Sequence, residues 1–220
     1  MKITKNTRTR RGSGGRPSQV EAEIRGRRLT EIAAGLFLER GFEATSVDAV
    51  AAAAGVSKAT LYSHYEDKAD LFAAVLRMQI DQLFKDIDQL NVVSGDAEQV
   101  LLKLGRHALA MSTRPEAASI YRTVIGQAQR FPALAEMIDR EGFQRGSANI
   151  AKVLQSLAAR GSLELGDPVV AAEHFLNLVI GRQSRMAMLG LEIDSKKLED
   201  GLPAAVRLFL RGTGNPAFRR

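Results

Sequence analysis

The sequence predicts an all-α protein, with a small three-helix unit near the N-terminus and a larger helical domain behind it. Apolar residues recur at intervals of three and four along most of the chain, which is the spacing of one face of an α-helix. No alternating pattern of the strand type competes with it. Glycine, proline and capping residues separate the periodic stretches. With 220 residues, 45% of them hydrophobic, the chain can bury a core without cross-links.

The first helix is expected from about residue 22 to Gly41, where the periodic pattern ends. Its apolar stripe consists of Leu29, Ile32, Ala33, Leu36 and Phe37. The segment before it, residues 1–21, contains several glycines and a proline and almost no large apolar side chain. Such a composition cannot bury enough surface to order itself, so we expect a flexible basic arm.

Two short helices are expected next. Thr45 and Ser46 offer an N-cap for a helix over 47–54, and Gly55 can take the left-handed conformation that ends it. Ser57 caps a second short element over 58–64, and the small Ala51 allows the two helices to approach closely. The pair fits a helix-turn-helix.

The rest of the chain predicts a larger helical domain. Asp67, followed three residues later by Asp70, starts a long helix that links the two regions. Glycine and proline then divide the chain into helices near 97–112, 116–129, 133–160, 168–189 and 195–211. Pro168 suits the first position of its helix, whereas Gly201 and Pro203 are expected to kink or split the last one.

Charge and composition narrow the possible functions. Residues 1–28 carry a local net charge of +7 against +6 for the whole chain, so the basic charge is an N-terminal feature. A basic arm on a nearly neutral protein favours an anionic partner such as nucleic acid. The chain has no cysteine, no long apolar run and no apolar stretch after the basic N-terminus, which indicates a soluble cytoplasmic protein without a membrane span.

An enzyme is not expected. The three histidines are scattered at positions 64, 107 and 174, and neither an H-E-x-x-H motif nor a phosphate-binding loop occurs. We therefore expect no catalytic residue, no metal site and no cofactor.

The segment 46–65, SVDAVAAAAGVSKATLYSHY, is the strongest functional signal. From Ala49 to Tyr65 it has no acidic residue, as a phosphate-facing surface requires. Lys58 falls in the first turn of a helix, where its positive charge is repelled by the helix macrodipole and gains no favourable local interaction. A nearby phosphate would make the electrostatic energy of a cation at this position favourable. The alternative is that an alanine-rich helix pair with tyrosines is simply core. We favour double-stranded DNA as the partner.

At about residues 25–76 the chain resembles the TetR family of bacterial regulators, through LFLERGFEATSVDAVAAAAGVSKATLYSHYEDKADLF. The stretch from FPALAEMIDREGF through GSLELGDPVVAAEHFLNLVIG to AVRLFLRG is more loosely similar to the AefR-like subgroup. The resemblance implies a homodimeric regulator, by default a repressor, that binds a palindromic operator and is released by a small-molecule effector of unknown identity. The alternative is an architectural DNA-binding protein without a ligand response.

The same resemblance implies a division of the chain into an arm at 1–21, a DNA-binding domain at 22–67, a ligand-sensing and dimerisation domain at 68–213 and a tail at 214–220. Residues at DNA-contacting positions are Thr45, Ser46, Ser57, Lys58, Thr60, Tyr62, Tyr65 and Lys68. His64 is ambiguous, because the family's residue there often points toward the domain core. In the arm, Gly15-Arg16-Pro17 resembles the core of an AT-hook, so Arg16 is a candidate for the minor groove, the alternative being a nonspecific basic tail.

Candidates for a ligand pocket are polar and aromatic residues on the later helices, each of which can also be ordinary core or surface. They are His107, Met111, Tyr121, Phe143, His174 and Asn177. The resemblance places dimerisation on the helices near 168–189 and 195–211, with the apolar residues Phe175, Leu178, Val179, Leu208 and Phe209 as the expected interface.

Overall fold

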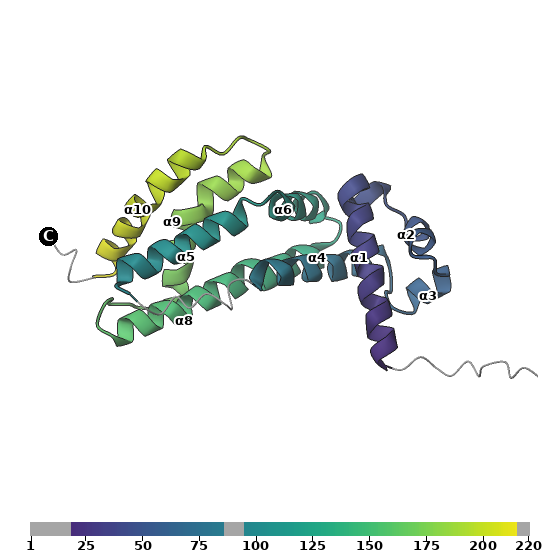
Figure 1. Ribbon diagram of the computed structural model, residues 1–220, viewed down its shortest axis with the longest axis horizontal. Helices are drawn as coiled ribbons and strands as arrows, with labels where there is room; N and C mark the ends of the chain where they lie inside the picture. Colours follow the sequence, from purple (N-terminus) through teal and green to yellow (C-terminus); the bar gives the residue numbers. More distant parts are fainter. Residues whose placement is uncertain (1–18, 86–94, 215–220) are drawn as a thin grey trace, which may run out of the picture.

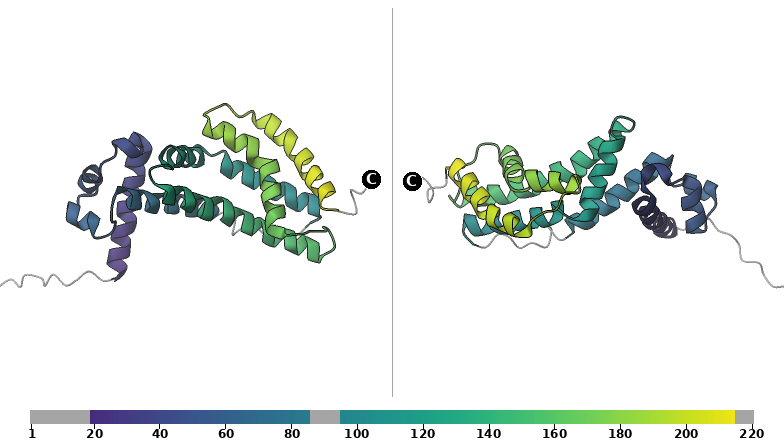
Figure 2. Two further views of the ribbon diagram at one scale, coloured as in Figure 1. Left: turned by 180° about the vertical axis from the view of Figure 1, so that it is seen from behind. Right: turned by 90° about the horizontal axis from the view of Figure 1, so that it is seen from above.

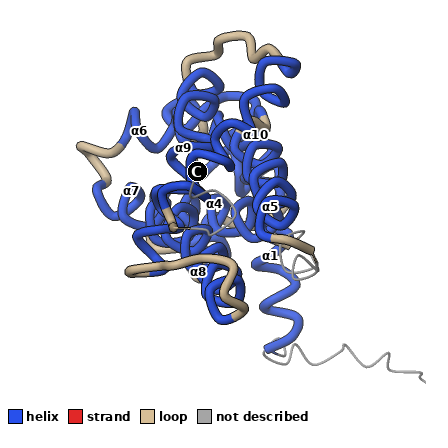
Figure 3. Tube along the Cα trace, turned by 90° about the vertical axis from the view of Figure 1, so that its left-hand side faces the viewer, coloured by secondary structure: helices blue, strands red, loops and turns tan. Residues whose placement is uncertain are grey.

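The computed structural model describes residues 19–85 and 95–214, and every element in these ranges is helical (Figure 3). The expected all-α class is confirmed. The elements are α1 Gln19–Ala44, α2 Val47–Ala54, α3 Lys58–Tyr62, α4 Lys68–Phe84, α5 Ala97–Ser112, α6 Pro115–Gln127, α7 Pro132–Ile138, the π-helical η1 Asp139–Gln144, α8 Arg145–Ala159, α9 Pro168–Met188 and α10 Ser195–Gly212. Figure 1 shows an elongated molecule, with α1 to α3 at one end and α5 and α8 to α10 at the other. Helix α4 runs between the two ends.

The local signals at the N-terminal end act as expected. Gly41 has a positive φ of 79° and interrupts α1 where the periodic pattern ends. The Ser46 hydroxyl accepts a hydrogen bond from the Ala49 amide and caps α2, which ends at Gly55 in the left-handed conformation. Helix α3 stops at Tyr62, two residues earlier than the sequence predicts.

Two expectations about the later helices are wrong. The single helix expected over 133–160 is a continuous path of three elements, because the π-helical turn η1 separates α7 from α8. The last helix is not split at Gly201 and Pro203, since α10 runs unbroken from Ser195 to Gly212. Pro203 cannot donate to the carbonyl four residues earlier, but that carbonyl belongs to Glu199, an exposed residue to which water has access.

Two hydrophobic cores organise the chain. The first gathers residues from α1 to α4 and from α6 and α7, with Phe37, Phe42 and Phe72 in ring contact at centroid distances between 4.9 and 5.9 Å. The second joins α5, α8, α9 and α10, where Phe175 and Phe209 meet edge to face at 5.2 Å. The first core continues across the expected domain boundary at residue 67, so α4 is packed as part of both regions.

The expected dimer residues divide into two groups. Phe175, Val179 and Phe209 are buried within the second core of the protomer, which corrects the expectation that they form an interface. Leu178 and Leu208 keep 43% and 60% of their surface exposed, so they remain open to a partner. Helix α9 is apolar on more than one face, and periodicity alone could not tell which face α10 covers.

Within the described ranges, no helix is long and apolar enough to cross a bilayer. The same residues contain no cluster of three histidine, aspartate or glutamate side chains that could hold a metal ion.

Candidate nucleic-acid interface and internal cavity

Helices α2 and α3 form the outer face of the N-terminal end, on the side of α1 away from the larger bundle (Figure 2). Ser57 caps α3 by accepting a hydrogen bond from the Thr60 amide at 3.1 Å, and the two hydroxyls lie 2.8 Å apart. Tyr62 is 48% exposed, while Leu61 beside it is buried and anchors the helix. The face that α3 presents to solvent therefore carries hydroxyl and phenol groups suited to hydrogen bonding with base edges and phosphates.

Lys58 has a local partner that the sequence-based reasoning missed. Its Nζ lies 2.7 Å from Oδ1 of Asp48 on α2, and this hydrogen bond and charge raise the pKa of Lys58. The expectation that the cation gains nothing locally is wrong, because Asp48 lies just outside the stretch without acids. Both side chains are exposed, so the pair is a weak one that a phosphate can compete with.

Two of the expected contact residues point into the protein. Thr45 is fully buried, and its hydroxyl is 3.1 Å from the Leu36 carbonyl and 2.8 Å from that of Gly41, at the end of α1. Tyr65 is also buried, and its hydroxyl lies 2.7 Å from that of Thr30 and 3.1 Å from the Gly26 carbonyl. We expected these two side chains to contact phosphate, and their burial corrects that expectation. Both instead have a positioning role, since they hold α1 against the helix-turn-helix.

Lys68 stands at the start of α4 in a partly covered position. Its ammonium donates to the Glu43 carbonyl at 3.1 Å and lies 4.4 Å from the centre of the Phe42 ring. Burial lowers the pKa of Lys68, and the charge of Glu43 opposes that shift. The ammonium has further N–H groups, so a phosphate contact stays a prediction.

The structure leaves two other expectations open. His64 is half-buried, with its ring 6.2 Å from that of Tyr65, which suits the ambiguous place expected for it. Arg16, with the rest of Gly15-Arg16-Pro17, lies outside the described residues.

A cavity of about 780 Å³ lies in the larger bundle, between the two hydrophobic cores. Its walls come from α4 to α9, including η1. Five of the six pocket residues expected from the sequence line it, namely His107, Met111, Tyr121, Phe143 and Asn177. His174 does not, because it lies on an exposed face of α9, and that expectation is corrected.

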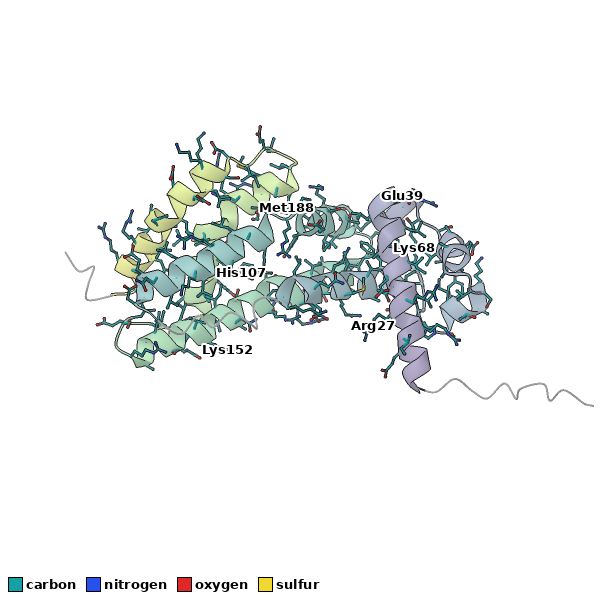
Figure 4. The ribbon with its side chains drawn as sticks, in the orientation of Figure 1. Arg27, Glu39, Lys68, His107, Lys152 and Met188 are labelled. Atoms are coloured by element: carbon teal, nitrogen blue, oxygen red, sulfur yellow. The ribbon has the colours of Figure 1, made fainter. Side chains whose placement is uncertain are left out.

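The cavity wall is mostly apolar and partly built from small residues, among them Gly142 and Gly181. Among its described lining residues, Asp139 is the only carboxylate and Lys152 the only lysine or arginine. In Figure 4, His107 lies near the middle of the bundle, with Lys152 toward its lower edge and Met188 toward its upper edge. The cavity therefore suits a largely apolar molecule better than a highly charged one.

Two connections join the cavity to the N-terminal end. Helix α4 packs Leu71 and Phe72 into the first core and lines the cavity with Phe84. Arg145 of α8 holds this end of α4, with its guanidinium 4.7 Å above the Phe84 ring. Helix α4 therefore contacts both the first core and the cavity.

The second connection is the turn between α6 and α7. Arg130 pairs with the Glu43 carboxylate at 3.3 Å, and the Phe131 ring lies 5.7 Å from that of Phe42. Helical periodicity does not predict these contacts, because Arg130 and Glu43 are 87 positions apart in the sequence. Since α6 and α7 also line the cavity, this turn links the cavity to the C-terminal end of α1.

Comparisons with known proteins agree with this architecture. Residues 29–75 match the model of the N-terminal domain of bacterial regulatory proteins of the TetR family. Residues 99–212, more than half of the chain, match that of the C-terminal domain of AefR-like transcriptional repressors. The chain belongs to the TetR family of transcriptional regulators. The helix-turn-helix of this TetR-family regulator is therefore a DNA-binding element, and the resemblance in the sequence is confirmed.

Solved structures extend the match over most of the chain. The flavonoid-responsive regulator FrrA is 33% identical, with a TM-score of 0.74, over 86% of this chain and 97% of its own. A TetR-family regulator from Mesorhizobium loti is 28% identical, with a TM-score of 0.79, over 87% of this chain and 97% of its own.

Sequence relatives match a shorter part of the chain. The transcriptional activator FasR of Mycolicibacterium smegmatis is 35% identical over 102 residues, 44% of this chain and 47% of FasR. The chain thus spans about half the length of the curated relatives it matches.

Proposed function

We propose that this TetR-family regulator is a repressor that binds a palindromic DNA operator as a homodimer and leaves it when a small molecule fills the cavity. The observation that carries the DNA-binding part is the free face of α3. It presents Lys58 and Tyr62 to solvent at the outer end of the molecule, with Ser57 as the cap of the helix. A helix placed in this way can enter the major groove.

The dimer is supported by the outer face of α9 and α10. Leu178 and Leu208 are large apolar residues that the protomer leaves exposed, and Val169 and Val170 add to the exposed apolar surface of α9. A two-fold dimer built on this face would relate two copies of α3 by symmetry, which requires a palindromic site.

The release mechanism is supported by the two connections from the cavity. A ligand can shift the protein toward an arrangement unfit for DNA only if it binds that arrangement more tightly. A bound molecule that presses on Phe84 would displace α4, and one that moves α6 would displace the Arg130–Glu43 and Phe131–Phe42 contacts. Both displacements act on the helix-turn-helix through its own core.

Repression is favoured by the match to the C-terminal domain of AefR-like transcriptional repressors, whereas the relative FasR is a transcriptional activator. FrrA is a flavonoid-responsive regulator, so we propose flavonoids as the first effectors to test on this chain. An architectural DNA-binding protein remains the second candidate. A cavity of about 780 Å³ that shares its walls with α4 favours the ligand-responsive regulator over it.

The DNA-binding proposal is tested by separating base recognition from phosphate attraction. A 20- to 30-base-pair site chosen from a random pool is titrated with wild-type protein, Thr60→Val and Lys68→Ala. Thr60→Val should change the order of preference among sequences, because it removes an exposed hydroxyl from α3. Lys68→Ala should weaken all sequences by a similar factor. Loss of selectivity with Lys68→Ala and none with Thr60→Val would contradict this assignment of roles.

A further inference from the structure

The Tyr121 hydroxyl is a polar group of the cavity wall that is available to a ligand. Tyr121 lines the cavity from α6, and among the described residues its hydroxyl makes no hydrogen bond. Tyr65, by contrast, directs its hydroxyl to Thr30 and Gly26. A hydroxyl that opens into the cavity without a protein partner is free to donate a hydrogen bond to a ligand that supplies an acceptor.

The π-helical turn η1 stands against this hydroxyl. At Gly142 in η1, a Cβ atom would come within 3.2 Å of the Tyr121 hydroxyl oxygen. The absence of a side chain at this position therefore keeps the approach to the hydroxyl open. π-helical turns are rare and occur often at functional sites. Here the turn brings the backbone of Gly142 and the ring of Phe143 to the cavity wall.

The charge near the hydroxyl limits what can bind to it. Asp139 begins η1, lines the cavity, and accepts a hydrogen bond from the Gln144 amide at 2.7 Å. Burial raises the pKa of Tyr121, and the negative charge of Asp139 raises it further. The hydroxyl is therefore a protonated donor at neutral pH, and an anionic acceptor beside it would be repelled by Asp139.

We propose that the cavity takes an uncharged, largely apolar organic molecule whose neutral acceptor oxygen receives a hydrogen bond from Tyr121. The cavity volume of about 780 Å³ lies in the range of sites for drug-sized organic molecules. Apolar walls supply most of the contact, and the Tyr121 hydroxyl orients the ligand. This inference rests on the ligand-responsive function proposed above and names the chemistry of its effector.

Three probes that share one tricyclic ring system test the chemistry: fluorene, its ketone 9-fluorenone, and 9-fluorenone-4-carboxylate. Equilibrium dialysis against the full chain measures their binding without any DNA. The ketone should bind about fivefold more tightly than fluorene, the factor expected for one net hydrogen bond. The carboxylate should bind more weakly than the ketone. Binding of none of the three probes, or tightest binding of the carboxylate, would overturn the proposed ligand class.

Variants assign the effect to the hydroxyl. Tyr121→Phe should reduce the preference for ketone over fluorene to about one while leaving fluorene binding unchanged. Gly142→Ala should weaken the ketone more than fluorene, and Gly126→Ala, a matched change with open space around its Cβ, should alter neither. A ketone preference that survives Tyr121→Phe would refute the anchor. DNA binding measured separately shows whether the proposed function fails as well, since it does not depend on these probes.

Discussion

Replacing Leu208 with Asp is expected to separate the proposed dimer without unfolding the protomer. Leu208 lies near the end of α10 with 60% of its surface exposed, so that surface is open to a partner. Its neighbour Phe209 and Phe175 on α9 are buried in the second core. An acidic residue at either of those positions would unfold the protomer and could not report on the interface.

The magnitude follows from the exposed fraction. Full burial of a leucine side chain stabilises by about 1.5–3 kcal/mol, so burial of the exposed 60% of Leu208 contributes about 1–2 kcal/mol. A two-fold interface contains two copies, which doubles the figure to about 2–4 kcal/mol. The dissociation constant of the dimer should therefore rise by a factor of about 30 to 1,000. Two carboxylates brought together at the interface would increase it further.

Sedimentation equilibrium over a range of protein concentrations measures this change. Leu38→Asp is a matched control, because Leu38 is 64% exposed and also lies near the end of its helix, but on α1 rather than α10. The control should remain as dimeric as the wild type, and both variants should keep a cooperative thermal transition. An unchanged dimer for Leu208→Asp, or equal weakening by both variants, would refute the interface.

Asp48→Asn should strengthen DNA binding, because it removes a carboxylate and frees Lys58 to contact phosphate. In titrations at several salt concentrations, the slope of log affinity against log salt concentration should become steeper by about one unit. Without any effector, Gly146→Leu should weaken DNA binding, measured by fluorescence anisotropy, by at least about fivefold. Even a Cβ at this position lies 3.7 Å from Phe84, so a larger side chain would press on α4. Phe42→Ala should lower the free energy of unfolding in urea by about 3–5 kcal/mol, because its ring is buried among aromatic neighbours.

Each of these expectations has an opposing result. Weaker DNA binding by Asp48→Asn would mean that its pair with Lys58 positions α3 rather than competing with phosphate. Gly146→Ala is the control for pressure on Phe84, because a single methyl group makes an ordinary contact there. Equal effects of the alanine and leucine variants would contradict that coupling route. A loss of less than about 1 kcal/mol for Phe42→Ala would show that its ring contacts are not limiting for stability.

Features set by neighbouring residues could be predicted from the sequence. Ser46, Ser57 and Asp67 each accept a hydrogen bond from the amide of the third residue of the helix they cap, and Gly55 ends α2 in the left-handed conformation. Such signals act within one helical turn and need no knowledge of the rest of the fold. The same segment carries the resemblance to the TetR family, which needs no knowledge of the packing.

Features set by distant residues could not be predicted in this way. The partners of Tyr65 are 35 and 39 positions away, and Arg130 meets Glu43 across 87 positions. The helical periodicity predicts the helices themselves, but it does not predict which face of α9 is covered by α10. Buried Phe175 and exposed Leu178 were therefore expected together at one interface. The cavity residues were predicted better, because polar and aromatic side chains on otherwise apolar helices tend to line internal space.

The central claim, that α3 of a two-fold dimer recognises specific DNA, is tested most directly by footprinting the wild-type protein on fragments that it selects from a random pool. The account predicts protection that is symmetric about a centre, with two half-sites separated by a whole number of helical turns. Substitution at Thr60 or Tyr62 should change which half-site sequence is selected. Selection of fragments without a common sequence, or protection confined to one asymmetric patch, would contradict the account.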